Sequence, residues 1–399
     1  MINTLDQQLC CGCSACVQIC PKKCISLEKD REGFSYPRTD MNGCIDCGLC
    51  EKVCPALRDD SETSSPEAYA FMHGNEEVRN ASSSGGLFTL LAETVINMGG
   101  VVFGARFDDQ WQVELAYAET LQDLALFRGS KYVQARVGDA YMAAETFLKQ
   151  GRLVLFSGSP CQIMGLKLFL KKEYYNLLTV DFVCHGVPSP LVWSRYLEED
   201  IARKGDAGKN SVLASPKVSP VITGVNFRDK STGWKKFSFV LNISEATAAG
   251  EQNTVLSSIF DDNVYMRAFL SDLSLRPSCY RCPAKGGKSG ADITMGDFWG
   301  IEKLYPELDD DKGTSLVLVN SIRGREYITD LADKLHEVNL LESIKGNSAY
   351  RHSVTRPVNR DYFFRCIRKG CSVQDAVRAC ESSNLFHRMR RLVFRKFGI

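Results

Sequence analysis

One cysteine pattern occurs twice in the first 55 residues. Cys10, Cys13, Cys16 and Cys20 precede Pro21, and the second run, which precedes Pro55, consists of Cys44, Cys47, Cys50 and Cys54. Each run reads C-x2-C-x2-C-x3-C-P, the spacing by which thiolates hold [4Fe–4S] clusters. A segment that must place two such sets of thiolates around clusters has little freedom left in its own fold. This pattern therefore predicts an iron–sulfur module that carries electrons.

The spacing also predicts which cysteines share a cluster. Three cysteines at x2 spacing wrap one cluster, and the fourth, before proline, reaches the other cluster, as in two-cluster ferredoxins. The expected ligand sets are Cys10, Cys13, Cys16 with Cys54, and Cys44, Cys47, Cys50 with Cys20. Zinc sites usually combine two cysteine pairs across a longer spacer, which fits this pattern less well.

Two further cysteines, Cys11 and Cys24, fall outside the pattern. Cys24 precedes a short predicted strand, so we interpret it as a small buried thiol, and Cys11 as a bystander between ligands. The alternative for either residue is that it substitutes for a ligand.

Composition excludes several classes of protein. The net charge of +1 over 399 residues argues against a nucleic-acid-binding protein, which usually carries a basic excess. No apolar run approaches the roughly 20 residues of a membrane span. The N-terminus has neither a basic nor an apolar signal region, and the 17 cysteines fall largely in metal-type spacings. These features predict a reducing, cytoplasmic location.

We predict four segments along the chain. They are a ferredoxin-type domain at 1–58, a polar linker at 59–67, a main domain at 68–345 and a basic helical tail at 346–399. Within the first segment, SLEKDREGFSYPRTD alternates like a hairpin with its turn near Gly33. In the main domain, apolar strands such as VVFGARF, RLVLFSG and LLTVDFV alternate with amphipathic helices, which predicts an α/β core with a mostly parallel sheet.

Four later cysteines form a second candidate site. Cys161 and Cys184 each follow a predicted strand, and Cys279 and Cys282 form a C-x2-C pair. Ligands bind beyond the carboxyl ends of strands in doubly wound sheets. The four thiols are therefore candidates for a third [4Fe–4S] cluster, and from spacing alone two core thiols plus half of a zinc site fit equally well.

A glycine-rich loop precedes the first helix of the main domain. Ser84, Gly85 and Gly86 place backbone N–H groups at that helix N-terminus, where the helix dipole favours phosphate. The loop matches neither a P-loop nor a G-x-G-x-x-G fingerprint, so a plain helix cap is the alternative. Ser130-Lys131-Tyr132 and the turn at Gly158 are further polar segments for the same pocket.

Five motifs in their order resemble the family of the coenzyme F-420 hydrogenase/dehydrogenase beta subunit, which is similar to the plant 7-hydroxymethyl chlorophyll a reductases. They are SSSGGLFTLLAETVINMGGVVFGARF, RGSKYVQ, VLFSGSPCQIMGLKLFL, VDFVCHGVPSPLVW and ADITMGDFWG, and the resemblance covers about residues 68–345. It implies an α/β flavoprotein domain that follows an α+β ferredoxin-like 2[4Fe–4S] module. It also implies a third cluster on Cys161, Cys184, Cys279 and Cys282, and FAD held by Ser84, Gly85, Gly86, Ser130, Lys131, Gly158, Pro160 and Gln162.

These observations lead to one leading functional hypothesis. A flavin beside clusters converts a two-electron step into one-electron transfers, so we expect an oxidoreductase acting between ferredoxin-type clusters and a small substrate, coenzyme F-420 or another. The alternative is an electron-transfer subunit that serves a partner enzyme, a hydrogenase, a dehydrogenase or an enzyme of polysaccharide biosynthesis. Expected partners are a ferredoxin or another redox protein and a small-molecule donor or acceptor, with no nucleic acid.

Two candidate catalytic residues, a pair of aromatic residues and the basic tail can each be interpreted in two ways from the sequence. His185 and Lys131 are candidate catalytic residues, as a proton donor and as a positive charge near the flavin, or else a structural histidine and a surface lysine. Phe298 and Trp299 in GDFWG either wall the flavin pocket or pack the core. The basic tail FHRMRRLVFRKFGI either lies on an anionic membrane surface or packs as a helix on the protein.

Overall fold

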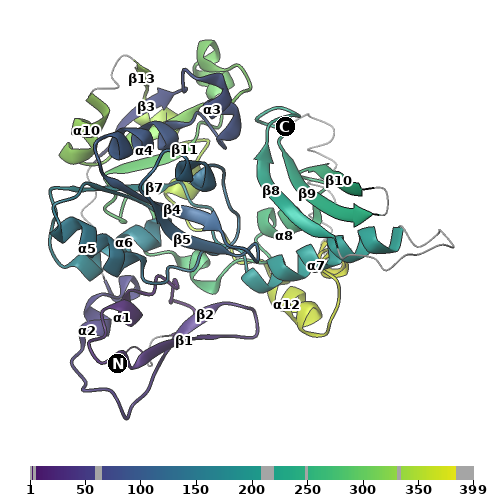
Figure 1. The fold of residues 1–399 in the computed structure, drawn as a ribbon, viewed down its shortest axis with the longest axis horizontal. Helices are drawn as coiled ribbons and strands as arrows, with labels where there is room; N and C mark the ends of the chain where they lie inside the picture. The colour runs from purple at the N-terminus through teal and green to yellow at the C-terminus, as the bar shows by residue number, and fades with distance from the viewer. Residues whose placement is uncertain are drawn as a thin grey trace.

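The computed structural model describes Ile2 and residues 6–58, 65–207, 220–247, 250–329 and 334–382. Figure 1 shows three parts: a small N-terminal module, a large central sheet covered by helices, and a three-stranded sheet with its own helices at one side. No described helix is long and apolar enough to span a bilayer. The predicted basic tail after Leu385 and most of the predicted linker fall outside the described residues.

The N-terminal module consists of a hairpin and short helical turns that carry the cysteines. Its strands pair antiparallel in the register Ile25↔Thr39 to Lys29↔Ser35, which confirms the predicted hairpin. Its elements are β1 (Ile25–Lys29), β2 (Ser35–Thr39), α1 (Ala15–Gln18), α2 (Leu49–Lys52) and η2 (Pro55–Leu57).

The hairpin tip fits closely against the main domain. Asp30 closes the turn, because its carboxylate accepts 2.9 Å hydrogen bonds from the backbone N–H groups of Glu32 and Phe34. Gly33 has a left-handed φ of +85°, and a side chain there would overlap Leu191. Only glycine adopts this φ without strain and leaves room for Leu191. Gly33 therefore serves both the turn and the contact between the hairpin and the main domain.

The central sheet has eight strands in the order β13-β3-β12-β11-β7-β6-β4-β5. Its four middle strands, β4, β6, β7 and β11, run parallel, and every pairing outside them is antiparallel. The strands are β3 (Glu67–Phe71), β4 (Val101–Phe107), β5 (Val113–Ala118), β6 (Val154–Ser157), β7 (Leu177–Phe182), β11 (Ile293–Asp297), β12 (Ser315–Val319) and β13 (Leu335–Glu337). The prediction of a mostly parallel sheet is therefore right for β4, β6, β7 and β11 and wrong for the strands outside them. β5 returns antiparallel from β4 through a short turn, and β13 pairs antiparallel with β3 although α10 precedes it in the chain.

Helices cover both faces of this sheet. One face carries α5 (Ala140–Lys149) and α6 (Pro160–Leu170), whose apolar residues pack with those of the N-terminal module. The other face carries α4 (Leu87–Asn97) and α10 (Ile322–Thr329). The smaller elements around the sheet are α3 (Glu76–Ala81), η3 (Asp123–Phe127), η4 (Pro277–Arg281), α9 (Ile301–Leu304), η5 (Pro306–Leu308), α11 (Leu340–Ser343) and η7 (Ser348–Tyr350).

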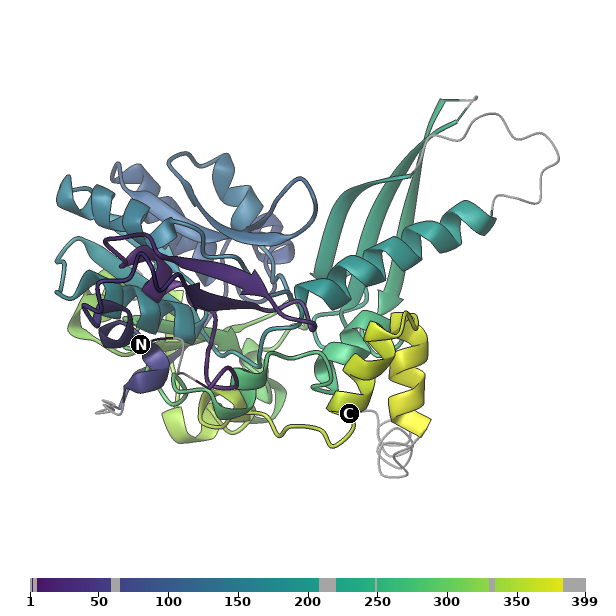
Figure 2. The same cartoon turned by 90° about the horizontal axis from the view of Figure 1, so that it is seen from below.

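The three-stranded sheet extends away from the central one (Figure 2). It consists of β8 (Val221–Asp229), β9 (Ser238–Thr247) and β10 (Gly250–Ile259), and the predicted pairing of the first two is confirmed. Its aromatic core includes Trp193, Phe227, Phe239 and Tyr265. The helices packed there are α7 (Pro190–Ala207), α8 (Val264–Leu270), α12 (Arg360–Arg368) and α13 (Val373–Ser382).

Candidate functional site

The structure brings the first predicted ligand set together where the module packs on the main domain. We call Cys10, Cys13, Cys16 and Cys54 the inner thiols. Cys13 and Cys54 are buried. Burial raises the pKa of Cys16 to about 12, and the neighbouring Cys10, Cys54 and Cys50 thiols add to the rise. The inner thiols Cys10, Cys16 and Cys54 are thus close enough to interact, as ligands of one cluster must be.

The second predicted set lines a small pocket on the outer side of the module. We call Cys20, Cys44, Cys47 and Cys50 the outer thiols, and all four line this pocket. Cys47 is exposed. Cys20 thus lies beside the second run, while the assignment of each fourth cysteine to the cluster of the other run stays a prediction.

The two extra cysteines lie beside different thiol sets. Cys24 lines the outer pocket, and its Sγ lies 3.4 Å from that of Cys20. Cys11 is buried, and its thiol is within hydrogen-bonding reach of both Cys13 and Cys161. Cys11, which lies outside the sequence pattern, is therefore located between the inner thiol Cys13 and Cys161.

Cys161, Cys184, Cys279 and Cys282, the core thiols, gather beyond the parallel strands. Cys161 is the second residue of α6, which closely follows β6, and Cys184 follows the adjacent strand β7. Burial raises the pKa of Cys184 well above its usual range, and the other three core thiols contribute to the rise while Lys285 opposes it. The other three core thiols are therefore close enough to Cys184 to influence its ionisation. Among the described residues, no three His, Cys, Asp or Glu side chains are placed to hold a single metal ion.

Hydrogen bonds fix the surroundings of the core thiols. Ser159 Oγ lies 3.3 Å from Cys161 Sγ, and the Val187 N–H donates to Cys279 Sγ at 3.4 Å. Burial raises the pKa of Cys279 to about 12, and the charge of Arg276 opposes that rise. Donors around sulfur atoms are typical of iron–sulfur sites, where they adjust the cluster potential.

A cavity of about 670 Å³ opens beside the core thiols. Of the residues predicted for FAD, those that line it are Ser84, Gly86, Ser130, Lys131, Gly158 and Gln162. Gly85 and Pro160 belong to the same segments without lining it. Cys184 and His185 form part of its wall, so the cavity and the core thiols share a boundary.

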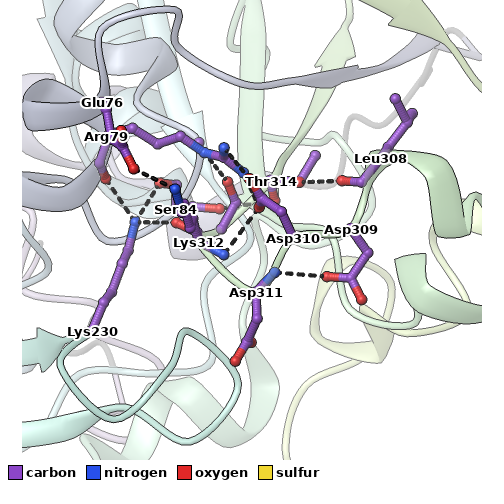
Figure 3. A network of polar contacts seen from close by, with 12 residues as sticks. Glu76, Arg79, Ser84, Lys230, Leu308, Asp309, Asp310, Asp311, Lys312 and Thr314 are labelled. Atoms are coloured by element: carbon purple, nitrogen blue, oxygen red, sulfur yellow. Dashed lines mark hydrogen bonds and ion pairs between the residues drawn. The ribbon is translucent and has the colours of Figure 1, made fainter.

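A polar network holds the glycine-rich loop at one end of this cavity (Figure 3). Lys230 Nζ donates to the carbonyl oxygens of Ser84, Arg79 and Lys312, at 2.7 to 2.8 Å. Ser84 Oγ donates to the Thr314 carbonyl at 2.9 Å. The loop is therefore fixed before any ligand arrives.

Glycine is required in this loop for two separate reasons. A side chain on Gly85 would overlap the Phe71 carbonyl, and its N–H donates to Ser315 Oγ at 2.9 Å. Gly86 has a left-handed φ of +89° and precedes α4 without a side-chain cap. The first N–H groups of α4 are therefore left for an anionic ligand.

The predicted catalytic residues lie on different parts of the cavity wall. Lys131 Nζ donates to the carbonyls of Leu126, Arg128 and Gly129, at 2.9 to 3.2 Å, and burial lowers its pKa to about 7. Since these bonds use its three donors, Lys131 holds the 126–129 loop. His185 Nε2 lies 2.6 Å from Asp272 Oδ1, and its ring meets Phe269 edge-on.

The cavity wall also contains Arg228, which the sequence interpretation missed, and Trp299, which it considered together with Phe298. Arg228 is buried there, donates to Asp297 Oδ2 at 2.8 Å, and stacks over Phe237. Trp299 lines the cavity, stacked on Trp234, whereas Phe298 is fully buried in the core. The pairing register of β8 shifts between Asn226 and Asp229, and both Phe227 and Arg228 are buried, so alternation along the strand gave no signal for Arg228.

Two family models match separate parts of the chain. Residues 151–343 match the model for the C terminus of "Coenzyme F420 hydrogenase/dehydrogenase, beta subunit", and residues 9–57 match "4Fe-4S dicluster domain". The first match includes the core thiols, and the second includes the inner and outer thiols. The resemblance stated from the sequence motifs is confirmed.

Known proteins share these parts. The F subunit of the F(420)H(2) dehydrogenase of Methanosarcina mazei is 23% identical over 46% of this chain and 55% of its own length, so this chain spans about half of that relative. The uncharacterized ferredoxin MJ0199 of Methanocaldococcus jannaschii is 39% identical over 14% of this chain and 86% of its own length. The F420-reducing [NiFe] hydrogenase complex of Methanosarcina barkeri aligns with a TM-score of 0.43 at 15% identity, over 81% of this chain and 91% of that one.

Proposed function

Because residues 151–343 match the model for the C terminus of the coenzyme F420 hydrogenase/dehydrogenase beta subunit and residues 9–57 match a 4Fe-4S dicluster domain, we propose that the chain is an iron–sulfur flavoprotein oxidoreductase. Electrons pass between the clusters of the N-terminal module and a two-electron substrate. Their path runs from the outer thiols through the inner thiols and a third [4Fe–4S] cluster on the core thiols to FAD in the cavity.

The shared boundary between the core thiols and the cavity carries this proposal. Cys184 belongs to the core thiols and also lines the cavity. Cys11 contacts both Cys13 and Cys161, so the inner and core thiols also approach each other closely. Short separations between successive sites are what a chain of electron carriers needs.

The cavity fits FAD in size and chemistry. Its volume of about 670 Å³ lies within the range of roughly 300–1,000 Å³ for cofactor pockets. The uncapped start of α4 and the fixed Ser84 loop would hold the pyrophosphate. Bound FAD would supply two-electron chemistry toward a substrate and one-electron chemistry toward a cluster.

Two residues would act on the bound cofactor and substrate. Lys131 supplies a positive charge near the flavin or its phosphates. His185, oriented by Asp272 at 2.6 Å, lies in the wall between Cys184 and the cavity, where it would hold a proton close to the reacting groups.

The similarity to one subunit of an F(420)H(2) dehydrogenase makes coenzyme F420 the first substrate to test, with other small reducible compounds after it. The same name favours a second candidate function, because it describes a subunit. In that case this chain transfers electrons to a partner enzyme and has no substrate of its own.

Iron and flavin content test the cofactor set. Protein purified without oxygen should contain about 12 iron atoms per chain, given four per cluster, and should release FAD in acid. A Cys279→Ala/Cys282→Ala variant should retain about 8 iron atoms, whereas the control Cys366→Ala/Cys371→Ala, on and after α12, should retain all of them. Full iron in the first variant removes the third cluster, and absence of flavin removes FAD.

A pH titration tests Lys131. Because burial holds its pKa near 7, Lys131 is protonated below that pH and loses its charge as the pH rises. The affinity of flavin-free protein for FAD should therefore fall between pH 6 and 8.5, and Lys131→Met should remove this dependence. An unchanged dependence in the variant would exclude the proposed role.

Turnover by the single chain separates the two candidate functions. Protein with full iron and FAD should reduce oxidised coenzyme F420 when dithionite or reduced ferredoxin feeds the clusters. Fully loaded protein that reduces no small substrate until a partner enzyme is added would favour the second function.

A further inference from the structure

Four arginines are buried among the described residues, and three of them have a carboxylate partner. Arg79 pairs with Asp310, Arg228 with Asp297 and Arg360 with Glu32, at 2.6 to 2.8 Å. The fourth, Arg276, is 1% exposed. In the described part of the chain, its hydrogen bonds go to the carbonyls of Cys10 and Ser35, at 2.6 and 2.9 Å, to Gln134 Oε1 at 3.0 Å and to Cys10 Sγ at 3.6 Å.

A buried guanidinium needs a counter-charge as well as hydrogen bonds. Removing a charge from water costs several kcal/mol unless an opposite charge compensates for it. The rings of Tyr36 and Phe34, 4.4 and 5.4 Å from the Arg276 Cζ, add cation–π attraction but no net charge. The counter-charge of Arg276 must therefore come from another group.

Arg276 spans the boundary between two thiol sets. Its backbone belongs to the core site, because its carbonyl accepts the Cys279 N–H at 2.9 Å and its own N–H donates to Val187. Its side chain reaches the inner thiols at Cys10. Gly12 closes over it, since a side chain on Gly12 would lie 2.9 Å from Nη1. A [4Fe–4S] cluster on four thiolates is net negative, so clusters at these two sites would supply the missing charge.

We propose that Arg276 is a positioning residue that raises the reduction potentials of the inner and core clusters relative to the outer one. A fixed positive charge in a dry environment stabilises the reduced cluster, which carries one more electron. The effect decreases with distance and with exposure to solvent. Arg276 thus favours electron entry from the outer cluster toward the cavity. For the core cluster this inference rests on the proposed function.

Redox titration followed by electron paramagnetic resonance tests the proposal on the full chain. Arg276→Gln should shift the midpoints of the inner and core clusters to more negative potentials and leave the outer midpoint in place. The outer signal is assigned as the one that Cys47→Ser abolishes. Arg276→Lys, which keeps the charge, should recover most of the shift.

Two further variants separate charge from structure. Gln134→Glu is isosteric and gives Arg276 the carboxylate that its three counterparts have, so the same two midpoints should move to more negative values. It provides the test if Arg276→Gln fails to load iron. The control Arg267→Gln/Glu381→Gln removes a different arginine together with its carboxylate partner, between α8 and α13 rather than at this boundary, and should move no midpoint.

Unmoved inner and core midpoints in the variants that load iron, or equal shifts of all three clusters, would overturn the proposal. Its failure is distinguishable from failure of the proposed function. If wild-type protein holds only about 8 iron atoms, the third cluster is absent, and the Arg276 effect is still measured as the difference between the inner and outer clusters.

Discussion

The inner and outer thiols have the same spacing and opposite surroundings. The inner set contains buried Cys13 and Cys54, and its module packs against α6. The outer set includes exposed Cys47, next to Ile45 at 59% exposure and near Met41 at 52%. The cysteine pattern is thus the same at both sites, and docking on the main domain makes their surroundings different. The outer site is exposed at Cys47, and the inner site lies against α6.

Breaking the contact between the hairpin and the main domain should expose the inner thiols like the outer ones. Of the changes predicted here, it should also reduce the stability of the protein most. Arg360 is 2% exposed and makes a bidentate ion pair with Glu32, at 2.6 and 3.1 Å. Glu32→Gln leaves the guanidinium without its partner, which costs about 3–5 kcal/mol for a buried pair. Denaturant unfolding should show this loss, and the inner cluster should become sensitive to chelators.

The double variant Glu32→Leu/Arg360→Met provides the control. Because it removes both charges, it should be more stable than either single variant. A single variant with wild-type stability would show that the hairpin contact does not hold the module.

Iron removal should distinguish the two sites directly. We expect a chelator to remove iron in two phases, with about four atoms per chain leaving first from the exposed outer site. Cys47→Ser should lack this fast phase and keep the slow one. A single phase in wild-type protein would contradict the assigned difference in exposure.

A smaller change at the packing surface should affect the inner site alone. A Cβ on Gly165 in α6 would lie 3.0 Å from both Cys13 Sγ and Tyr141 Oη. Gly165→Ala should therefore destabilise the protein by about 1–3 kcal/mol through overpacking, partly offset by the roughly 1 kcal/mol helix preference of alanine. Thermal unfolding measures the loss, and the spectrum of the inner cluster should change.

Gly74→Ala is the matched control, because nothing lies within 4 Å of its added Cβ. If the spectrum of the inner cluster is unchanged in Gly165→Ala, α6 and Cys13 are packed loosely enough to accommodate the added methyl group.

The smallest effects should come from the two cysteines outside the pattern. Cys11→Ser and Cys24→Ser should each retain full iron, since neither residue belongs to a ligand set, and should change unfolding by less than about 1 kcal/mol. Loss of about four iron atoms in either variant would identify that cysteine as a substitute ligand.

Local patterns predicted much of the fold and part of the site. The hairpin of 25–39 and the strands that became β4, β6 and β7 follow from alternation and apolar runs over a few residues. The grouping of Cys161 and Cys184 follows from parallel neighbouring strands. The edge strands β5 and β13 were missed, because half-exposed antiparallel edges have weaker apolar patterns.

Contacts across long stretches of chain account for the rest of the site. Arg276 lies 266 positions from Cys10 in the sequence. The residues around Arg276 in the sequence therefore do not indicate that its guanidinium has no carboxylate partner among the described residues. Lys230 reaches back 146 positions to hold the Ser84 loop. The contact between the N-terminal module and the main domain also places Cys11 beside Cys161. The position of Cys11 in the cysteine run does not indicate this contact.

The pair between Glu32 and Arg360 joins positions 328 residues apart. During synthesis the hairpin that carries Glu32 leaves the ribosome 328 residues before Arg360 does. The contact between them therefore cannot form until α12 has emerged. That interval gives the cell's cluster-assembly machinery access to a site that the finished protein closes, so clusters delivered late should enter the outer site more readily than the inner one.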